Sequence, residues 1–219
     1  LCQKDFIGIF PENTLWLVYC RKCWYSDNWD QFQYSQEFNT SKSLLQQYFE
    51  LRKKVPRLGI IQQGMNVNSL YTNCVGNNKD CYLIFGSNFN EGCAYGVIFR
   101  DSKDCFDCYG VNKSEFCYQC TDCFNSYQLF FSQNCTDCRE SAFLLNCRNC
   151  SNCFLSSNLV NQNYCILNKQ YSREEYFRTL KEFSLSDQKS IEQLSQQFQE
   201  IRKKYMVKAM NGNRNNNVS

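Results

Sequence analysis

The sequence predicts a mainly β protein with flanking helices, built around a narrow β-solenoid. Cysteines recur every twelve residues, as in Cys81, Cys93, Cys105 and Cys117. Further cysteines, such as Cys108, lie three residues after members of this series. A fixed internal period is typical of solenoids, in which each repeat is one coil. The thirteen cysteines in this three-residue phase are Cys81, Cys93, Cys105, Cys108, Cys117, Cys120, Cys123, Cys135, Cys138, Cys147, Cys150, Cys153 and Cys165.

The other positions in this phase also carry small or apolar side chains. Val75, Phe99 and Leu129 stand where the twelve-residue series has no cysteine, and Gly96 and Ser102 occupy the alternate places. An inward-facing residue at every third position, with little room for it, describes the inside of a narrow β-solenoid. The same pattern fits neither a helix nor a β-sandwich.

A coil of twelve residues gives more uniform columns than a coil of eighteen. An eighteen-residue coil would stack Arg100 and Thr136 on aromatic residues. A twelve-residue coil gives a column that is apolar throughout, and we therefore expect about eight coils over residues 69–168, stacked at roughly 4.8 Å. The column contains Leu70, Tyr82, Ala94, Phe106, Tyr118, Phe130, Ala142, Phe154 and Ile166.

Three interpretations of the solenoid cysteines stay open. Cysteine is a compact apolar filler that suits a cavity too narrow for leucine. Disulfides across the core are the second interpretation, because Cys117 and Cys123 lie half a coil apart, as do Cys147 and Cys153. The third is a metal–thiolate or iron–sulfur centre, because the CxxCxxC arrays resemble part of a ferredoxin cluster motif.

Residues 1–34 form a separate unit with a zinc-knuckle pattern. Cys20 and Cys23 are spaced as CxxC after a β-like run, and Cys2 lies eighteen residues earlier. A structural zinc site needs four ligands, so these three cysteines predict one zinc site whose fourth ligand is still open. We expect the fourth ligand to be an aspartate or a residue before Leu1. The second source is open because the sequence does not begin with Met. Two packed thiols without a metal are the alternative.

Two resemblances add to this interpretation. The solenoid pattern is similar to the twelve-residue coils of beetle antifreeze proteins, but residues such as Asp80 and Tyr82 flank the inward cysteine where those proteins have threonines, so ice binding is not expected. The string VYCRKCWYSDNWD at residues 18–30 resembles the VYCxxCWWSDKWD signature of uncharacterised bacterial cysteine-repeat proteins. That family implies a zinc knuckle beside a cysteine repeat, and it implies no activity.

Residues 35–68 are expected to form a capping helix and a linker. A helix over 39–55, capped by Thr40 or Ser41 and ended by Pro56, has an apolar side that includes Leu44 and Phe49. We expect this helix to cover the first coil and block growth at the solenoid edge.

Residues 169–210 carry the pattern of amphipathic helices. Ser172 and Glu175 form a capping box, and a second helix begins near Asp187. Its apolar seam either packs on the aromatic column of its own solenoid or pairs with another chain. The seam consists of Ile191, Leu194, Phe198, Ile201 and Tyr205. The Asn-rich residues 211–219 predict a disordered tail.

Composition argues against catalysis. The 219 residues include no histidine, which excludes Ser-His and Cys-His nucleophile pairs, and no glycine-rich phosphate loop follows a strand. The 24 basic and 21 acidic residues give no strong field for nucleic acid, and no apolar run is long enough to span a bilayer. The chain is also too long to be a small secreted disulfide scaffold, which favours a cytoplasmic location over an extracellular one.

The sequence therefore predicts a non-catalytic scaffold that contacts other protein chains. Self-association through the C-terminal helix is one form that this contact can take. A metal–thiolate or iron–sulfur protein is the alternative. A nucleic-acid-binding accessory protein, using the knuckle and the basic clusters at 52–54 and 202–204, is third. The expected interaction face comprises Tyr82, Phe106, Tyr118, Phe130, Phe154, Ile191, Leu194, Phe198, Ile201 and Tyr205.

Overall fold

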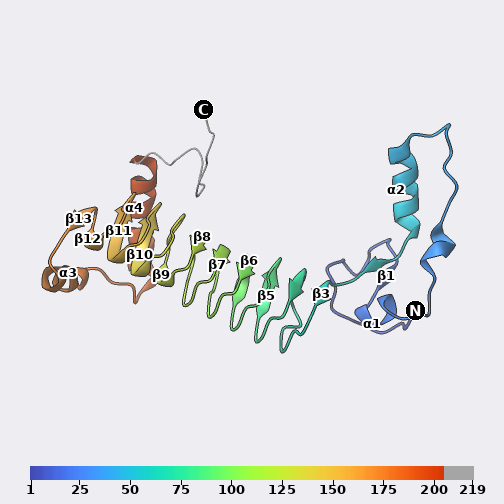
Figure 1. The fold of residues 1–219 in the computed structure, drawn as a ribbon, viewed down its shortest axis with the longest axis horizontal. Helices are drawn as coiled ribbons and strands as arrows, with labels where there is room; N and C mark the ends of the chain where they lie inside the picture. Colours follow the sequence, from blue (N-terminus) through green and yellow to red (C-terminus); the bar gives the residue numbers. More distant parts are fainter. Residues whose placement is uncertain (205–219) are drawn as a thin grey trace.

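The computed structural model describes residues 1–204. It is an elongated molecule with an N-terminal unit at one end, a rod of stacked coils in the middle and a pair of helices at the other end (Figure 1). The expectations for Tyr205 and for the tail at 211–219 lie outside the described residues.

The N-terminal unit is small and only loosely folded on itself. Its one ladder joins two short parallel strands, in which Val18 pairs with Arg57 and Tyr19 with Leu58. Between these strands the chain forms short helices and loops (Figure 1). The elements are β1 (Val18–Tyr19), α1 (Arg21–Trp24), the 3₁₀ helix η1 (Gln31–Tyr34), α2 (Leu44–Lys54) and β2 (Arg57–Leu58).

The rod is a β-solenoid whose coils pair in parallel with a register of twelve residues. Tyr82 pairs with Ala94, and Cys153 pairs with Cys165. The same register links each member of the apolar column from Tyr82 to Ile166 to the next, which confirms the coil length. The strands are β3 (Gln62–Gln63), β4 (Val75–Gly76), β5 (Tyr82–Phe85), β6 (Ala94–Arg100), β7 (Tyr109–Asn112), β8 (Thr121–Phe124), β9 (Tyr127–Phe130), β10 (Arg139–Leu145), β11 (Ser151–Ser157) and β12 (Asn163–Ile166).

The solenoid begins earlier than the sequence pattern indicated. Gln62 already pairs with Val75, thirteen residues later, so the first turn holds one extra residue. The rod has about nine turns. The boundary expected at Ser69 was therefore late, because the irregular first turn lacks the cysteines that mark the later ones.

Every third residue of the rod has a left-handed backbone conformation. From Asp80 to Leu167 the residue before each inward position has a positive φ, between 45° and 68°. This conformation is unfavourable for most side chains and acceptable for Asn, Asp and Gly. More than half of these positions carry one of those three residues. The repeated left-handed residue turns the chain, and this makes the next side chain point inward.

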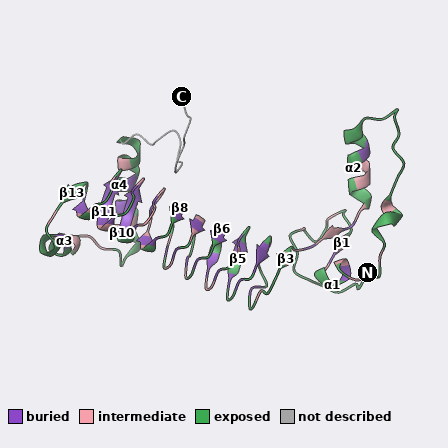
Figure 2. Cartoon of the chain, in the orientation of Figure 1, coloured by how far each residue is buried: buried purple, intermediate pink, exposed green. Residues whose placement is uncertain are grey.

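The C-terminal end of the rod is closed by a short hairpin and two helices. Strand β13 (Lys169–Gln170) pairs antiparallel with β12, which ends the parallel stacking. The capping box predicted at Ser172 and Glu175 is present and begins α3 (Arg173–Leu180). Helix α4 (Gln188–Lys204) lies across β10 and β11. Buried residues concentrate inside the coils and beneath these helices (Figure 2).

Helix α2, which was expected to cap the first coil, does not pack on the rod. It begins at Leu44, and the hydroxyl of Ser43, rather than Thr40 or Ser41, accepts the Gln46 N–H at 3.2 Å. The buried Gln47 side chain binds the backbone of Asn39, at 2.8 Å and 2.9 Å, and so holds the preceding residues in a loop. The apolar side of α2 faces solvent. The prediction that it covers the solenoid edge was wrong.

No helix within residues 1–204 is long and apolar enough to cross a membrane.

Candidate functional sites: the cysteine core and the N-terminal thiol cluster

The solenoid cysteines lie inside the rod, where four inward positions per coil form four columns. All thirteen are buried, as the periodicity predicted. They share their columns with serine, valine, leucine and phenylalanine; Ser141 and Leu129, for example, stand in the column of Cys117 and Cys153. A ligand set for a metal does not tolerate such replacements, whereas a packed core does.

Cysteine and serine make the same two hydrogen bonds in these columns. The Cys105 thiol donates to the carbonyls of Lys103, at 3.2 Å, and Ser114, at 3.5 Å. The Ser102 hydroxyl donates to the carbonyls two residues before and nine residues after it, at 2.8 Å and 3.5 Å. The carbonyls of Lys103 and Ser114 already accept ladder N–H groups, at 3.1 Å and 3.0 Å. The backbone groups that point inward are N–H groups such as that of Ser126, which donates to the Ser114 hydroxyl at 3.1 Å, so a small side chain with an acceptor satisfies them. This requirement, together with size, accounts for the choice of Cys and Ser.

The thiols also act on one another electrostatically along the rod. Cysteines in successive coils, or three residues apart in the chain, shift one another's pKa from Cys81 to Cys165. The contact with the Cys105 thiol, followed by burial, raises the pKa of Cys93 to about 12. The neighbouring thiols of Cys105 and Cys120 hold the pKa of Cys117 below its ordinary value.

An asparagine ladder extends the core toward its N-terminal end, and the sequence reasoning missed it. The side-chain oxygen of Asn66 accepts the Asn78 N–H at 3.1 Å, and that of Asn78 accepts the Asn90 N–H at 2.9 Å. Asn90 in turn accepts the Ser102 N–H at 3.1 Å. The signal was a twelve-residue spacing of asparagines in phase with the cysteines. At the end of this ladder, the Gln62 amide donates to the Ser69 carbonyl at 3.1 Å.

The three cysteines of the N-terminal unit come together, as the zinc-knuckle pattern predicted. The thiols of Cys2 and Cys20 are 3.8 Å apart, and both lie within 4.8 Å of the Cys23 sulfur. Sulfurs in a tetrahedral site with Zn–S bonds of about 2.3 Å lie roughly 3.8 Å apart, so the spacing fits zinc. Among residues 1–204 this is the one cluster of three such ligands, and a fourth ligand is not among them.

Local backbone geometry positions these thiols. Cys20 immediately precedes α1 and Cys23 lies within it, so one short turn of helix presents both. Gln3 has a φ of 54°, which directs the Lys4 N–H back to the Cys2 sulfur. That N–H, followed by the thiols of Cys23 and Cys20, lowers the pKa of Cys2 to about 7. A thiol near its thiolate form at neutral pH is prepared to bind a metal.

The expected interaction face divides into an uncovered and a covered part. Tyr82 and Phe106 are exposed, and Tyr118, Phe130, Ile191 and Ile201 are half-buried. Phe154, Leu194 and Phe198 are buried, because α4 and the Phe183 ring, at 5.0 Å from the Phe154 ring, pack on the last coils. These three were wrongly assigned to an intermolecular face. The helical seam packs on its own solenoid.

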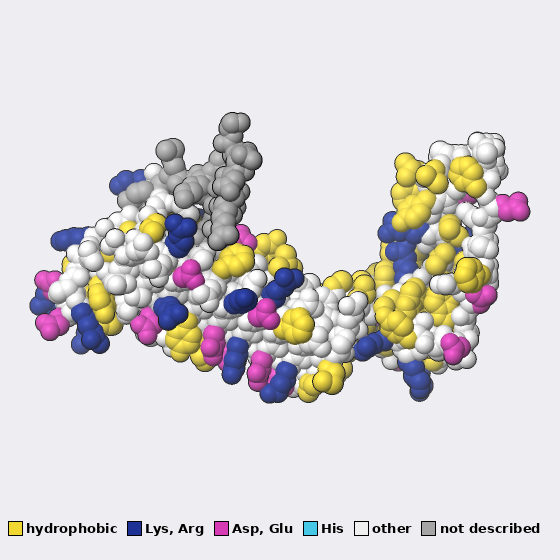
Figure 3. Space-filling view, in the orientation of Figure 1, with side chains coloured by type: hydrophobic (Ala, Val, Ile, Leu, Met, Phe, Trp, Pro, Cys, Tyr) yellow, Lys and Arg dark blue, Asp and Glu magenta, His cyan; other side chains and the backbone are white. Residues whose placement is uncertain are grey.

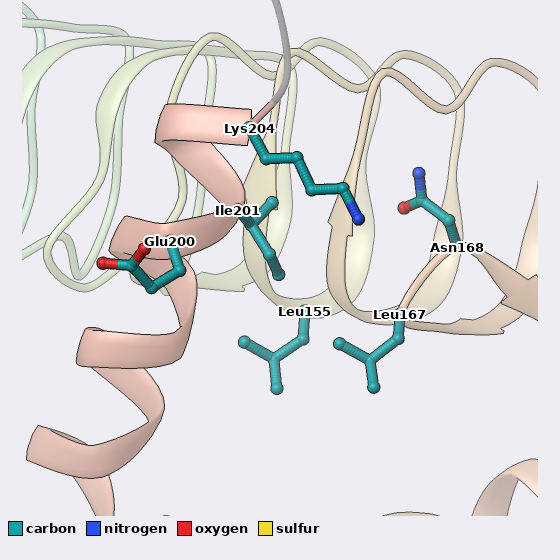
Figure 4. Close-up of a pocket in the computed structure, with 6 residues that line it drawn as sticks. All are labelled: Leu155, Leu167, Asn168, Glu200, Ile201 and Lys204. Carbon is teal, nitrogen blue, oxygen red and sulfur yellow. The ribbon is translucent and has the colours of Figure 1, made fainter.

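A cavity of about 240 Å³ lies where α4 meets the last coils (Figure 4). Leu155 and Leu167 lie side by side on neighbouring coils, and Ile201 approaches them from the helix. The rest of the lining is polar and comes from Asn168, Glu200 and Lys204.

The two basic clusters lie far apart. Residues 52–54 end α2 at one end of the rod, and residues 202–204 end α4 at the other (Figure 1). They do not form one surface for nucleic acid.

Comparisons with known proteins give little beyond the fold. No family model matches the sequence, and no curated protein does. One solved structure to which the chain is similar is a hexapeptide transferase family protein from Anaplasma phagocytophilum, with a TM-score of 0.15 and 9% identity over 67% of this chain and 95% of that one. This score is too low to support any argument about activity. The resemblance of residues 18–30 to bacterial cysteine-repeat proteins stays a prediction.

Proposed function

We propose that this protein is a non-catalytic scaffold that binds other protein chains along the aromatic face of its rod. The observation that carries the proposal is the exposed row of aromatic side chains on a rigid register. Tyr82 and Phe106 stand in one column with Ala94 between them, and the Tyr95 ring, beside Ala94, lies 5.7 Å from the Tyr82 ring; the three aromatic residues are each at least 40% exposed. Large rigid aromatic groups supply much of the binding energy in protein interfaces.

The core supports this proposal because its thiol and hydroxyl groups make hydrogen bonds to the backbone of the rod itself. The inward thiols donate to backbone carbonyls, and the inward hydroxyls do the same. A core of this kind produces a stiff rod whose outer columns stay at fixed spacing. Such an extended surface suits a subunit of a larger assembly.

We propose that the N-terminal thiol cluster holds one structural zinc ion. The cluster of Cys2, Cys20 and Cys23 would stabilise a unit that has little apolar core of its own, since its buried apolar side chains among the described residues are Tyr19, Cys23 and Pro56. Small domains without a sufficient core commonly depend on a metal.

A photo-crosslinking amino acid tests the scaffold proposal. Placed at Phe106 in the full chain within its native cells, it is expected to give cross-links to another protein chain. Phe124 is the matched control, because it has the same side chain, is 47% exposed and stands in a column half a coil away from that of Phe106. Equal labelling from both positions, or none from Phe106, would overturn the proposal.

A further inference from the structure

Helix α2 presents an apolar face that no part of the described chain covers. Leu44, Leu45, Tyr48 and Phe49 are all more than half exposed. Their spacing puts them on one side of the helix. Gln47, on another side, fastens the helix to the preceding loop. Figure 3 shows hydrophobic side chains gathered over this N-terminal unit. A contiguous apolar patch on a short helix is typical of a binding surface.

A second uncovered apolar face lies on the rod beside α4. On the last coils α4 covers this face, where the rings of Phe198 and Phe143 are 5.8 Å apart. The column of Phe143 continues along the rod as Phe131, Gln119 and Asp107, without that cover. Next to α4 lies a groove of about 380 Å³, with the apolar side chains of Tyr118 and Phe131 on the rod side and Ile191 on the helix side. Polar side chains complete its lining: Gln119, Gln188, Glu192, Ser195 and Gln196. The face already holds one amphipathic helix, so its surface suits a second.

The charges at the two faces are complementary. The apolar stripe of α2 continues one turn later into Arg52, which Lys53 and Lys54 follow. Glu192 lines the groove from α4. Asp107, which is exposed, stands in the column of Gln119 and Phe131, one coil before Gln119. A basic helix end therefore meets acidic groups at the groove, which favours this pairing and fixes its direction.

We propose that α2 of a second copy of this chain occupies the groove, and that the exchange is mutual in a two-fold dimer. The helices α2 and α4 project from opposite ends of the rod on the same side (Figure 1), so two antiparallel copies facing each other make both contacts at once. One helix of eleven residues buries little area, whereas a two-fold axis doubles it toward the roughly 1,000 Å² of a stable interface. The inference rests on the proposed function and names a partner for it.

Sedimentation velocity of the full chain over a concentration series tests the dimer. The wild type is expected to be dimeric at micromolar concentration. Leu45→Glu on α2 and Tyr118→Glu in the groove should each weaken dimerisation at least tenfold. Phe124→Glu, an exposed phenylalanine of the opposite column, should leave it unchanged. Far-UV circular dichroism shows that each variant keeps its fold.

Charge reversal gives a second test. Arg52→Glu with Lys53→Glu should dissociate the dimer, and adding Asp107→Lys with Glu192→Lys should restore it. A monomeric wild type, or a dimer that both single variants leave intact, would overturn the inference. A monomer that still cross-links another protein through Phe106 would leave the scaffold proposal standing, so the two failures are distinguishable.

Discussion

Asn90 binds Asn78 twice across adjacent coils. Both its backbone N–H and its side-chain amide donate to the same Asn78 oxygen at 2.9 Å, and the amide also donates to the Phe99 carbonyl at 3.2 Å. Both asparagines are buried. The pair shows how a core about one side chain wide satisfies its backbone without water.

Asn90→Ala is therefore expected to destabilise the rod strongly. The substitution leaves the Ser102 N–H without a partner in a closed core, whereas the Phe99 carbonyl keeps the Asn88 N–H at 3.0 Å. The orphaned donor and the lost amide bonds cost about 2 kcal/mol, which lowers the melting temperature by on the order of 5 °C. Asn88→Ala, two residues earlier and facing outward, is the control. Equal melting temperatures for the two variants would contradict the role of the ladder.

The left-handed positions give a second prediction. Asp101 has a φ of 49° and is exposed, so its replacement tests backbone strain with little change in packing. Asp101→Val should cost about 1–2 kcal/mol, because a β-branched side chain disfavours this conformation. Asp101→Gly should be close to neutral. The control is Arg100→Val, one residue earlier, where the φ is negative. Chemical denaturation measures all three, and a stable Asp101→Val would refute the argument.

The rod was predictable because its chemistry repeats. A twelve-residue spacing fixed the register from Tyr82 to Ile166, since every coil imposes the same size limit on its inward side chains. Cys2, Cys20 and Cys23 lie outside this period, and their clustering was predictable only from the CxxC motif and the cysteine that precedes it. Asn, Asp or Gly precede more than half of the inward positions, and this composition is a signal for the left-handed residues that the cysteine period does not carry.

The placement of α2 was not predictable from its own sequence. An apolar stripe indicates that a helix packs against another surface, but it does not identify which surface that is. The stripe of α4 packs on Phe143 and Phe154 of its own rod, whereas the similar stripe of α2 at Leu45 and Tyr48 packs on nothing in the described chain. The segment between α2 and the rod limits where the helix can lie, because β3, the first strand of the rod, begins only eight residues after α2 ends.

The core cysteines should behave as packing residues. Cys105→Ser keeps the donor to the carbonyls of Lys103 and Ser114 and should cost about 1 kcal/mol. Cys105→Phe exceeds the space in the coil and should cost about 3 kcal/mol or more. Metal content by mass spectrometry should be the same in both variants and the wild type. Loss of metal on Cys105→Ser would favour the iron–sulfur interpretation instead.

The N-terminal cluster should account for the zinc. Cys20→Ser removes one of three clustered sulfurs and is expected to lower bound zinc from about one equivalent to near zero. The rod does not depend on that ion, so its main thermal transition should persist. Cys74→Ser is the control, because Cys74 is exposed and lies outside the cluster. Zinc retained by Cys20→Ser would place the metal elsewhere.

Alkylation of the metal-free protein should begin at Cys2. The Lys4 N–H and the neighbouring thiols lower the pKa of Cys2 to about 7 from an ordinary value of 9.0. Because the thiolate is the reactive form, the rate with iodoacetamide should rise through a midpoint near pH 7 and level off about one unit above it. Peptide mass spectrometry at each pH separates Cys2 from the exposed Cys74 and from the buried rod thiols, which should stay unmodified while the rod is folded. Added zinc should suppress the reaction at Cys2 without slowing it at Cys74. A midpoint near pH 9 would mean that the backbone N–H does not stabilise the Cys2 thiolate in solution.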